Sequence, residues 1–163
     1  MRLSGLEARK RFAAARVARL ATAGADGQPL VVPVTFAVET GGAGGDRGDA
    51  RGGADPPATI VTIVDHKPKS TRTELRRLRD IRANPLVSLL VDHYDDEWAR
   101  LWWARADGLA RIVEAGDPRH AAAAAALTAR YRQYRQVPPT GPAIVVAVTR
   151  WSGWAYSESP TAP

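Results

Sequence analysis

The stretch from Thr59 to Asp92 constrains the fold of this chain more than any other segment. Thr59–Val64 is rich in β-branched residues and Leu86–Val91 is apolar, which is typical of strands that bury at least one face. Between these two runs, apolar residues recur at helical spacing from Leu75 to Ile81. The segment therefore predicts a strand, a basic loop, a helix and a second strand.

The predicted helix carries signals at both ends. Thr71 followed by Glu74 is a capping-box pattern, and Pro85 ends the helical pattern. The first N–H groups of a helix carry the positive end of its dipole, and Lys67 and Lys69 directly precede them. We therefore predict an anion site at this loop and helix start. The alternative is a solvated basic helix with its approach loop, because runs of charge are usually solvated faces.

Length and composition limit the class of protein. With 163 residues, the chain is about one domain and is long enough to bury a core. It has no cysteine, which excludes disulfides and thiolate chemistry, and His66, His93 and His120 lack metal-type spacing, so we expect no metal site. No apolar run fits a membrane span or a signal peptide, so we expect a soluble, cytoplasmic protein. The charge of +6 favours an anionic partner, which includes nucleic acids, phosphorylated cofactors and acidic metabolites.

The first third of the chain predicts a helix and two paired strands. Ser4–Ala15 fits a short amphipathic helix, and Arg16–Ala23 and Leu30–Val38 fit strands joined by an Asp-Gly hairpin turn. Pro33 lies inside the second strand. Because proline cannot donate to a β-ladder, Pro33 marks an edge strand, a bulge or an opening where a ligand reaches the backbone.

The remaining segments predict a loop, further strands and another helix. Residues 40–57 are rich in Gly, Asp and Pro, and we expect a flexible loop there. The predicted elements after Asp92 are, in order, strands at Trp98–Ala106 and Leu109–Glu114 joined by an Asp107-Gly108 hairpin turn, a helix from Asp117 to about Tyr134, and strands at Ala143–Thr149 and Gly153–Ser157.

These elements predict a mainly β fold. Six or seven strands follow one another in meander-like order, with one helix between the third and fourth strands and another before the last long strand. Short hairpins without β-α-β alternation favour an antiparallel barrel with peripheral helices over a Rossmann fold. Neither a dinucleotide-binding glycine motif nor a P-loop motif occurs. We expect residues 1–163 to form a single domain.

Five segments carry a resemblance to a known family. They are ARLATAGADGQPLVVPVTFAV at 18–38, DHKPKST at 65–71, IRANPLVSLLVDHY at 81–94, RLWWARADGLARI at 100–112 and WSGWAYS at 151–157. With these motifs the chain resembles the pyridoxamine 5'-phosphate oxidase-like split β-barrel family, in particular its F420-dependent (deazaflavin) oxidoreductase branch. The resemblance implies an FMN-binding split barrel fold. It also implies a homodimer with two cofactor sites at the subunit interface.

The resemblance assigns cofactor-binding residues in three groups. They are Pro33, Val34, Thr35, Val64 and Asp65 along the ring, Lys67, Lys69, Ser70 and Thr71 around the phosphate, and Trp103 and Trp154 as candidates for the groove wall. The phosphate group coincides with the anion site predicted from the helix start. For the two tryptophans the alternative is packing in the core. The basic residues lie earlier than in FMN-using relatives, in a longer loop, which favours coenzyme F420 over FMN.

Several functions are consistent with this interpretation. The first is an oxidoreductase that transfers a hydride from reduced F420 to an unsaturated or carbonyl-type small molecule, with an FMN-binding protein as the alternative. The second is a non-catalytic protein that binds F420, a flavin or a tetrapyrrole. The third is a nucleic-acid-binding barrel, for which only the strand from Arg100 to Arg105 has the required mixture of basic and aromatic residues. No catalytic dyad is evident, and His66, His93 and Tyr94 are the candidate proton donors.

Overall fold

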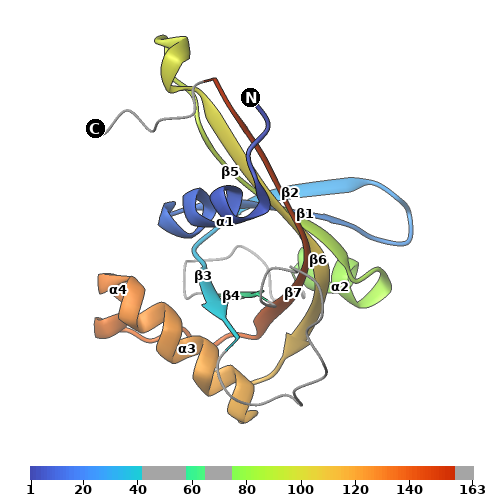
Figure 1. Ribbon diagram of the computed structural model, residues 1–163. Helices are drawn as coiled ribbons and strands as arrows, with labels where there is room; N and C mark the ends of the chain where they lie inside the picture. The colour runs from blue at the N-terminus through green and yellow to red at the C-terminus, as the bar shows by residue number, and fades with distance from the viewer. Residues whose placement is uncertain (42–57, 65–74, 157–163) are drawn as a thin grey trace, which may run out of the picture.

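The computed structural model describes residues 1–41, 58–64 and 75–156. Its strands are β1 (Ala18–Ala23), β2 (Pro29–Val34), β3 (Ala37–Thr40), β4 (Ala58–Ile63), β5 (Leu86–His93), β6 (Trp102–Val113) and β7 (Ala143–Ala155). Its helices are α1 (Gly5–Ala14), α2 (Arg76–Ala83), the 3-10 turn η1 (Trp98–Arg100), α3 (Pro118–Arg130) and α4 (Arg132–Gln136) (Figure 1). In the described part of the chain, no helix is long and apolar enough to cross a membrane.

The strands form one unclosed sheet in the order β2-β1-β5-β6-β7-β4-β3, and all neighbouring pairs are antiparallel. β2 and β3 are the two edges of this sheet, although only Thr35 and Phe36 separate them in the chain. The sheet therefore curls until its edges meet, with helices around it (Figure 1). This confirms the prediction of a mainly β, antiparallel barrel with peripheral helices. It also places Pro33 on an edge strand, one of its three predicted positions.

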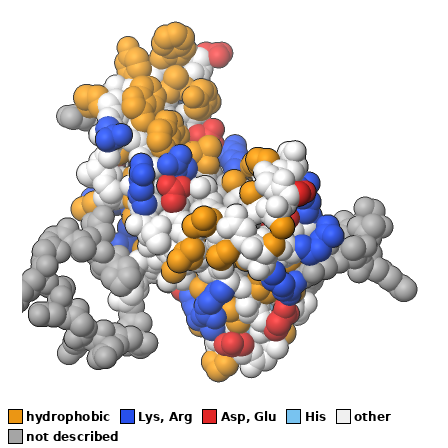
Figure 2. Space-filling view, turned by 90° about the vertical axis from the view of Figure 1, so that its right-hand side faces the viewer, with side chains coloured by type: hydrophobic (Ala, Val, Ile, Leu, Met, Phe, Trp, Pro, Cys, Tyr) orange, Lys and Arg blue, Asp and Glu red, His pale blue; other side chains and the backbone are white. Residues whose placement is uncertain are grey.

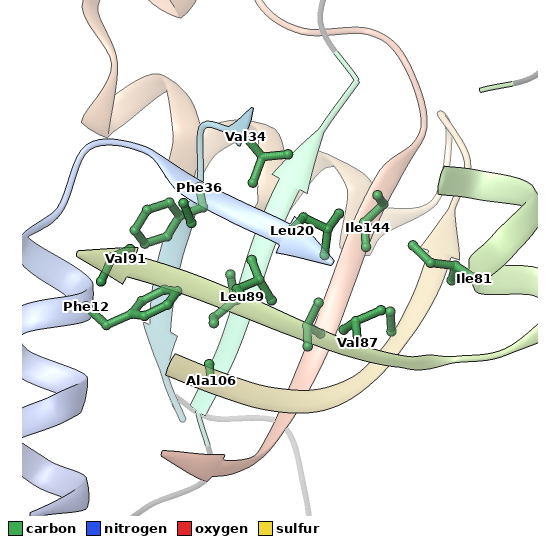
Figure 3. Packing of buried hydrophobic residues seen from close by; sticks show 14 of the residues in the cluster. Phe12, Leu20, Val34, Phe36, Ile81, Val87, Leu89, Val91, Ala106 and Ile144 are labelled. Carbon is green, nitrogen blue, oxygen red and sulfur yellow. The ribbon is translucent and has the colours of Figure 1, made fainter. Parts of the chain in front are cut away.

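Two clusters of buried side chains hold the fold together. The larger fills the barrel, where Phe12 of α1 packs edge-on against Phe36 with 4.9 Å between ring centroids (Figure 3). Leu20 and Leu89 reach the same interior from β1 and β5. The smaller cluster joins α3 and α4 to the strands β3, β4, β6 and β7, and Leu127 lies at 0% exposure within it.

Tyr131 stabilises the break at Thr35 and Phe36 between β2 and β3, here called the seam. It ends α3, and its hydroxyl accepts a hydrogen bond from the backbone N–H of Phe36 at 2.9 Å. The hydroxyl oxygen lies 2.8 Å from the carbonyl oxygen of Phe36 and 2.9 Å from that of Arg16, so the hydroxyl can donate its one proton to either of them. Because a buried N–H without a partner is costly, this one side chain stabilises the break between the two edge strands.

We expect Tyr131→Phe to lower the free energy of unfolding by about 2 kcal/mol, because it leaves the buried N–H of Phe36 without its acceptor. Urea denaturation followed by tryptophan fluorescence measures this loss. Tyr94→Phe is the matched control, since Tyr94 is 74% exposed. Equal midpoints for Tyr131→Phe and the unmodified protein would show that the seam does not depend on the hydroxyl.

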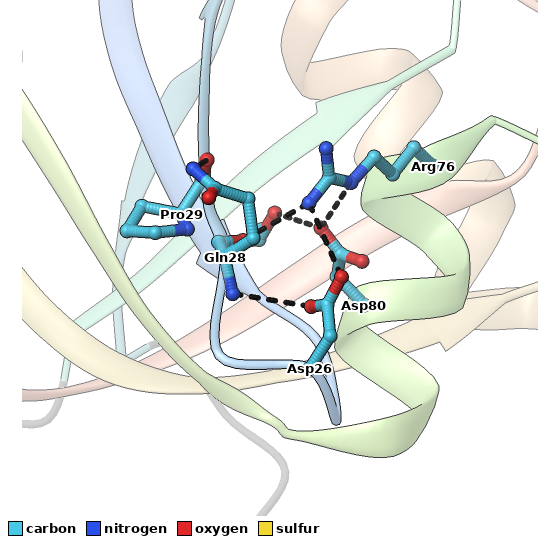
Figure 4. Close-up of polar contacts among 6 residues, drawn as sticks. Asp26, Gln28, Pro29, Arg76 and Asp80 are labelled. Carbon is cyan, nitrogen blue, oxygen red and sulfur yellow. Dashed lines mark hydrogen bonds and ion pairs between the residues drawn. The ribbon is translucent and has the colours of Figure 1, made fainter.

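Helix α2 is anchored to the hairpin between β1 and β2 through the carboxylate of Asp80. This side chain is buried, and the hydroxyl of Thr22 donates a hydrogen bond of 2.9 Å to it. Arg76 lies 3.8 Å from the same carboxylate and 3.9 Å from Asp26, and it donates to the carbonyl of Gln28 (Figure 4). The helix that follows the predicted anion loop is thus fixed to the sheet at its first turn.

The strands differ from the prediction at three places. The predicted strand Leu30–Val38 is two strands, because Phe36 and Ala37 are both buried and interrupt the alternation. The predicted hairpin at Asp107-Gly108 is wrong, since β6 continues through it with a shift of register against β7. β7 is likewise one strand from Ala143 to Ala155 rather than two. The last two errors came from treating a local break in the pattern as the end of a strand, whereas the first missed a break.

The helix boundaries also differ from the prediction. Leu75 is extended and α2 begins at Arg76, later than a capping box at Thr71 predicts; Thr71 itself lies outside the described residues. The predicted helix ending at Tyr134 breaks at Tyr131, where the backbone leaves the helical region. The cap at Asp117 is confirmed, because its carboxylate accepts a hydrogen bond from the N–H of Arg119 at 2.7 Å. Trp98 starts a 3-10 turn and not a strand.

Candidate functional site

The candidate site lies on the outer face of the sheet, which is the side turned away from the barrel core. Side chains alternate along a strand, so the neighbours of buried Leu20, Leu89 and Ala104 point to this face. The strand register arranges them in three rows: Val31, Ala21, Ser88, Asp107 and Arg150; Pro33, Arg19, Leu90, Arg105 and Ser152; and Asp92, Trp103 and Trp154. These residues form one continuous surface from the edge strand β2 to β7.

A central hollow of about 430 Å³ lies over β1, β2, β5 and β6. Its apolar lining includes Val31, Leu90, Tyr94 and Trp103. Its charged side chains are paired, since Arg19 contacts Asp92 and the guanidinium of Arg105 lies 3.0 Å from Asp107. The hollow therefore offers a largely apolar surface with its charges compensated.

A second hollow of about 400 Å³, here called the edge pocket, adjoins the first and shares Trp103 and Arg105 with it. On its far side β7 pairs with β4 only as far as Ala147, and the N-terminal segment meets β7 again through a bridge between Arg2 and Trp154. Within the described part of the chain, residues 148–152 have no strand partner on that side. The edge pocket occupies this gap.

Trp103 and Trp154 are brought together by the structure. They are directly opposite each other in the pairing of β6 with β7, and both are half-buried on the outer face. Both line the edge pocket, and so does Trp151, whose ring packs edge-on against Phe12 at 5.2 Å on the core side. Because Trp103 and Trp154 lie on the outer face, they are not part of the barrel core, which was the alternative to a place in the groove wall.

The predicted ring-binding residues on β2 and β4 form a separate group. Val34 and Val64 are each 8% exposed and belong to the same core cluster, so a ligand beside them meets their backbone. Pro33 is exposed, and the Thr35 hydroxyl lies 2.8 Å from that of Tyr134. The strands β1 and β5 lie between β2 and β6, a separation of roughly 14 Å at 4.8 Å per strand. Within one chain, the β2 group and the tryptophans lie on different parts of the molecule.

The predicted phosphate-binding residues lie outside the described residues. They are Asp65, Lys67, Lys69, Ser70 and Thr71, together with the candidate proton donor His66. The described ends of that segment are Val64, whose N–H donates to the carbonyl of Pro142 at 3.1 Å, and Leu75 at the start of α2.

The other candidate proton donors lie at the turn after β5. His93 is exposed, and its ring lies 3.5 Å from the carboxylate of Asp95. The pKa of Asp95 is lowered, first because the N–H of Glu97 donates to its carboxylate and then because Arg100 and His93 lie near it. Tyr94 lines the central hollow and is the candidate donor that reaches the outer face.

The chain was compared with known proteins. A family model for pyridoxamine 5'-phosphate oxidase matches residues 6–155, nearly the whole sequence. The chain belongs to this family. The split β-barrel is the fold of the pyridoxamine 5'-phosphate oxidase family, which agrees with the unclosed seven-stranded sheet. No curated protein matches the sequence.

Solved structures share the fold of this family at low sequence identity. An FAD-binding protein from Mesorhizobium loti is 23% identical over 94% of this chain and 95% of that chain, with a TM-score of 0.62. The FAD-binding protein from Mycobacterium smegmatis is 17% identical over 96% of this chain and 100% of that chain, with a TM-score of 0.55. A heme storage protein from Vibrio cholerae is 17% identical over 95% of both chains, with a TM-score of 0.57.

Sequence reasoning missed the polar residues of the edge pocket. Arg150 and Ser152 were placed in a break between two strands, so their alternation with Trp151 was not used. Once β7 is one strand, Arg150, Ser152 and Trp154 fall on the outer face at every second position. The sequence positions of Arg19 and Arg105 could have indicated the outer-face site, because each is a charged residue that alternates with core residues in a predicted strand.

Proposed function

We propose that this member of the family is an F420-dependent oxidoreductase whose cofactor lies between two copies of the chain. The observation that carries the proposal is the separation of Pro33, on the outer face of edge strand β2, from the pair Trp103 and Trp154 on the outer face of β6 and β7. One copy supplies the strand edge along the ring and the other supplies the tryptophan wall.

The chain's own residues would hold the cofactor through backbone, aromatic and basic groups. The backbone at Val34 and Val64 would lie along the ring, and the anion loop with Lys67 and Lys69 would hold the phosphate, since helix starts and ammonium groups favour anions. When bound, the reduced deazaflavin supplies a hydride to an unsaturated or carbonyl-type small molecule. The protein supplies binding, orientation and exclusion of water.

Exposed hydrophobic side chains support packing against a second copy. Val31, Tyr94 and Trp98 are 59%, 74% and 69% exposed. Figure 2 shows hydrophobic side chains gathered at the upper end of the molecule, where Figure 1 places the ends of β5, β6 and β7 with η1. Large exposed apolar patches on a folded chain mark interaction sites. A second copy would cover this surface and enclose the central hollow.

A flavin is the second candidate cofactor. Two of the solved structures with this fold are described as FAD-binding proteins, and another is described as a heme storage protein. The central hollow has a largely apolar lining with paired charges, which suits an isoalloxazine ring as well as a deazaflavin ring. Direct measurements of F420, FMN and FAD binding therefore distinguish an F420-dependent enzyme from a flavin-binding protein.

The experiment measures equilibrium binding of F420, FMN and FAD to the purified protein and to the double variant Lys67→Ala with Lys69→Ala. We expect the protein to bind F420 more tightly than either flavin. The double variant should lose roughly 100-fold in affinity, because two charge-assisted contacts with phosphate are removed. Lys10→Ala is the control, since Lys10 is an exposed residue of α1 on another part of the chain.

Sedimentation velocity in the same buffers measures whether two copies assemble. Unchanged F420 affinity in the double variant would show that the anion loop does not bind the phosphate. Tighter binding of FMN or FAD than of F420 would replace the deazaflavin proposal with the flavin alternative. A monomer that binds cofactor at full stoichiometry would contradict a site shared between copies.

A further inference from the structure

The edge pocket carries an excess of positive charge. Arg2 and Arg150 are exposed at its rim, and within the described residues neither makes an ion pair. Arg105 reaches it from β6 and is held by Asp107, to which its Nη2 donates at 3.1 Å. Asp107 also accepts a hydrogen bond from Ser88, so its carboxylate is already engaged. Among the residues that the structure describes, the guanidinium groups of Arg2 and Arg150 therefore face the pocket without a carboxylate partner.

Two buried polar atoms at the same pocket lack a hydrogen-bond partner. They are the Oγ of Ser152 and the Nε of Arg105, whose ion-pair contact with Asp107 is not aligned as a hydrogen bond. Ser152 and Arg105 are directly opposite each other in the pairing of β6 with β7. The Nε of Arg105 is engaged electrostatically by Asp107 at 3.0 Å. Since buried polar atoms in folded proteins are normally satisfied, the Oγ of Ser152 is the atom that indicates a ligand with an acceptor oxygen.

The pocket also has aromatic walls. Trp103 and Trp154 stand side by side on β6 and β7 beside the two polar atoms. Indole rings bind planar aromatic molecules through dispersion and ring stacking, and guanidinium groups bind carboxylates through paired N–H donors. Two indole rings, two guanidinium groups without an ion pair in the described part of the chain, and the unsatisfied Oγ of Ser152 therefore indicate a ligand with an aromatic ring and an anionic group.

We propose that the edge pocket binds a planar aromatic carboxylate, with the ring against Trp103 and Trp154 and the carboxylate at Arg150, Arg2 and Ser152. This site shares Trp103 and Trp154 with the proposed cofactor wall, whereas its polar residues Arg2, Arg150 and Ser152 lie outside the proposed phosphate and ring contacts of the cofactor. One part of the inference rests on the proposed function, namely that the bound carboxylate is a substrate lying beside the cofactor at Trp103 and Trp154. Binding itself needs no cofactor.

The test compares two probes of the same shape by isothermal titration calorimetry in the absence of cofactor. The probes are 2-naphthoate, which is an anion, and 2-naphthalenemethanol, which is neutral. We expect 2-naphthoate to bind more tightly than the alcohol, and Arg150→Gln to weaken 2-naphthoate roughly tenfold while leaving the alcohol unchanged, because one charge-assisted contact is lost. Arg111→Gln is the matched control, since Arg111 is an exposed arginine of β6 at a different hollow.

Three results would overturn the inference. They are no binding of 2-naphthoate by the unmodified protein, equal affinity for the alcohol and the carboxylate, and equal weakening by Arg150→Gln and Arg111→Gln. Cofactor affinity is measured separately on the same variants. Absence of F420 and flavin binding with intact, Arg150-dependent 2-naphthoate binding would reject the proposed function and retain the pocket.

Discussion

Replacing Gly108 with alanine is expected to destabilise the protein by about 3 kcal/mol, because the new methyl group has no room. An added Cβ at Gly108 would lie 2.4 Å from the carbonyl oxygen of Ala147 and 2.8 Å from a methyl group of Val146. Both atoms belong to β7, and one is backbone, so the clash is relieved only by moving a central strand. The register shift between Asp107 and Gly108 is at this same place.

Urea denaturation of Gly108→Ala and Gly27→Ala separates this steric effect from backbone strain. Gly27 has a φ of +72° and nothing within 4 Å of an added Cβ, so its substitution should cost only about 1 kcal/mol. Similar losses for the two variants would mean that β6 and β7 do not approach as closely at the bulge as described.

Phe12→Ala is expected to lower the free energy of unfolding by about 4 kcal/mol, the range for removing a fully buried aromatic ring. Phe12 is 0% exposed and packs edge-on against Phe36 at 4.9 Å and Trp151 at 5.2 Å. The substitution therefore leaves a cavity at the place where α1 meets the barrel, and Phe36 at the seam loses its neighbour. Thermal and urea unfolding monitored by circular dichroism measure the loss.

Leu6→Ala tests whether the effect depends on burial, because Leu6 lies on the same helix and is 51% exposed. We expect a change within about 0.5 kcal/mol for this control. A loss at Leu6 as large as that at Phe12 would place the contact face of α1 on its other side.

The fold class could be predicted from the sequence because hydrophobic alternation and hairpin signals are local. The β-branched run at β4, the apolar run at β5 and the Asp-Gly turn between β1 and β2 each appear at their predicted place. The errors arose where a tertiary contact decides the outcome. Asp107-Gly108 has the composition of a turn, but Gly108 is needed because β7 passes too close for a side chain.

The candidate site could be predicted only in part from the sequence. The resemblance selected Trp103 and Trp154, and the structure places both on the outer face beside each other. The pairing of Arg105 with Ser152, and the gap beside residues 148–152, depend on strand register and strand order. Hydrophobic alternation shows which residues of one strand share a face. It does not show which strand lies beside that strand or how the two are aligned, so strand order and register could not be predicted from it.

The seam between β2 and β3 differs from the other strand contacts of the barrel in what holds it together. Everywhere else around its circumference the described strands are joined by backbone ladders, whereas here the wall is fastened by a tyrosine hydroxyl on a helix. Because these hydrogen bonds come from a side chain between α3 and α4, they depend on how those helices pack against the sheet. The contact between β2 and β3 is therefore coupled to the packing of α3 and α4, whereas the other strand contacts depend on backbone pairing.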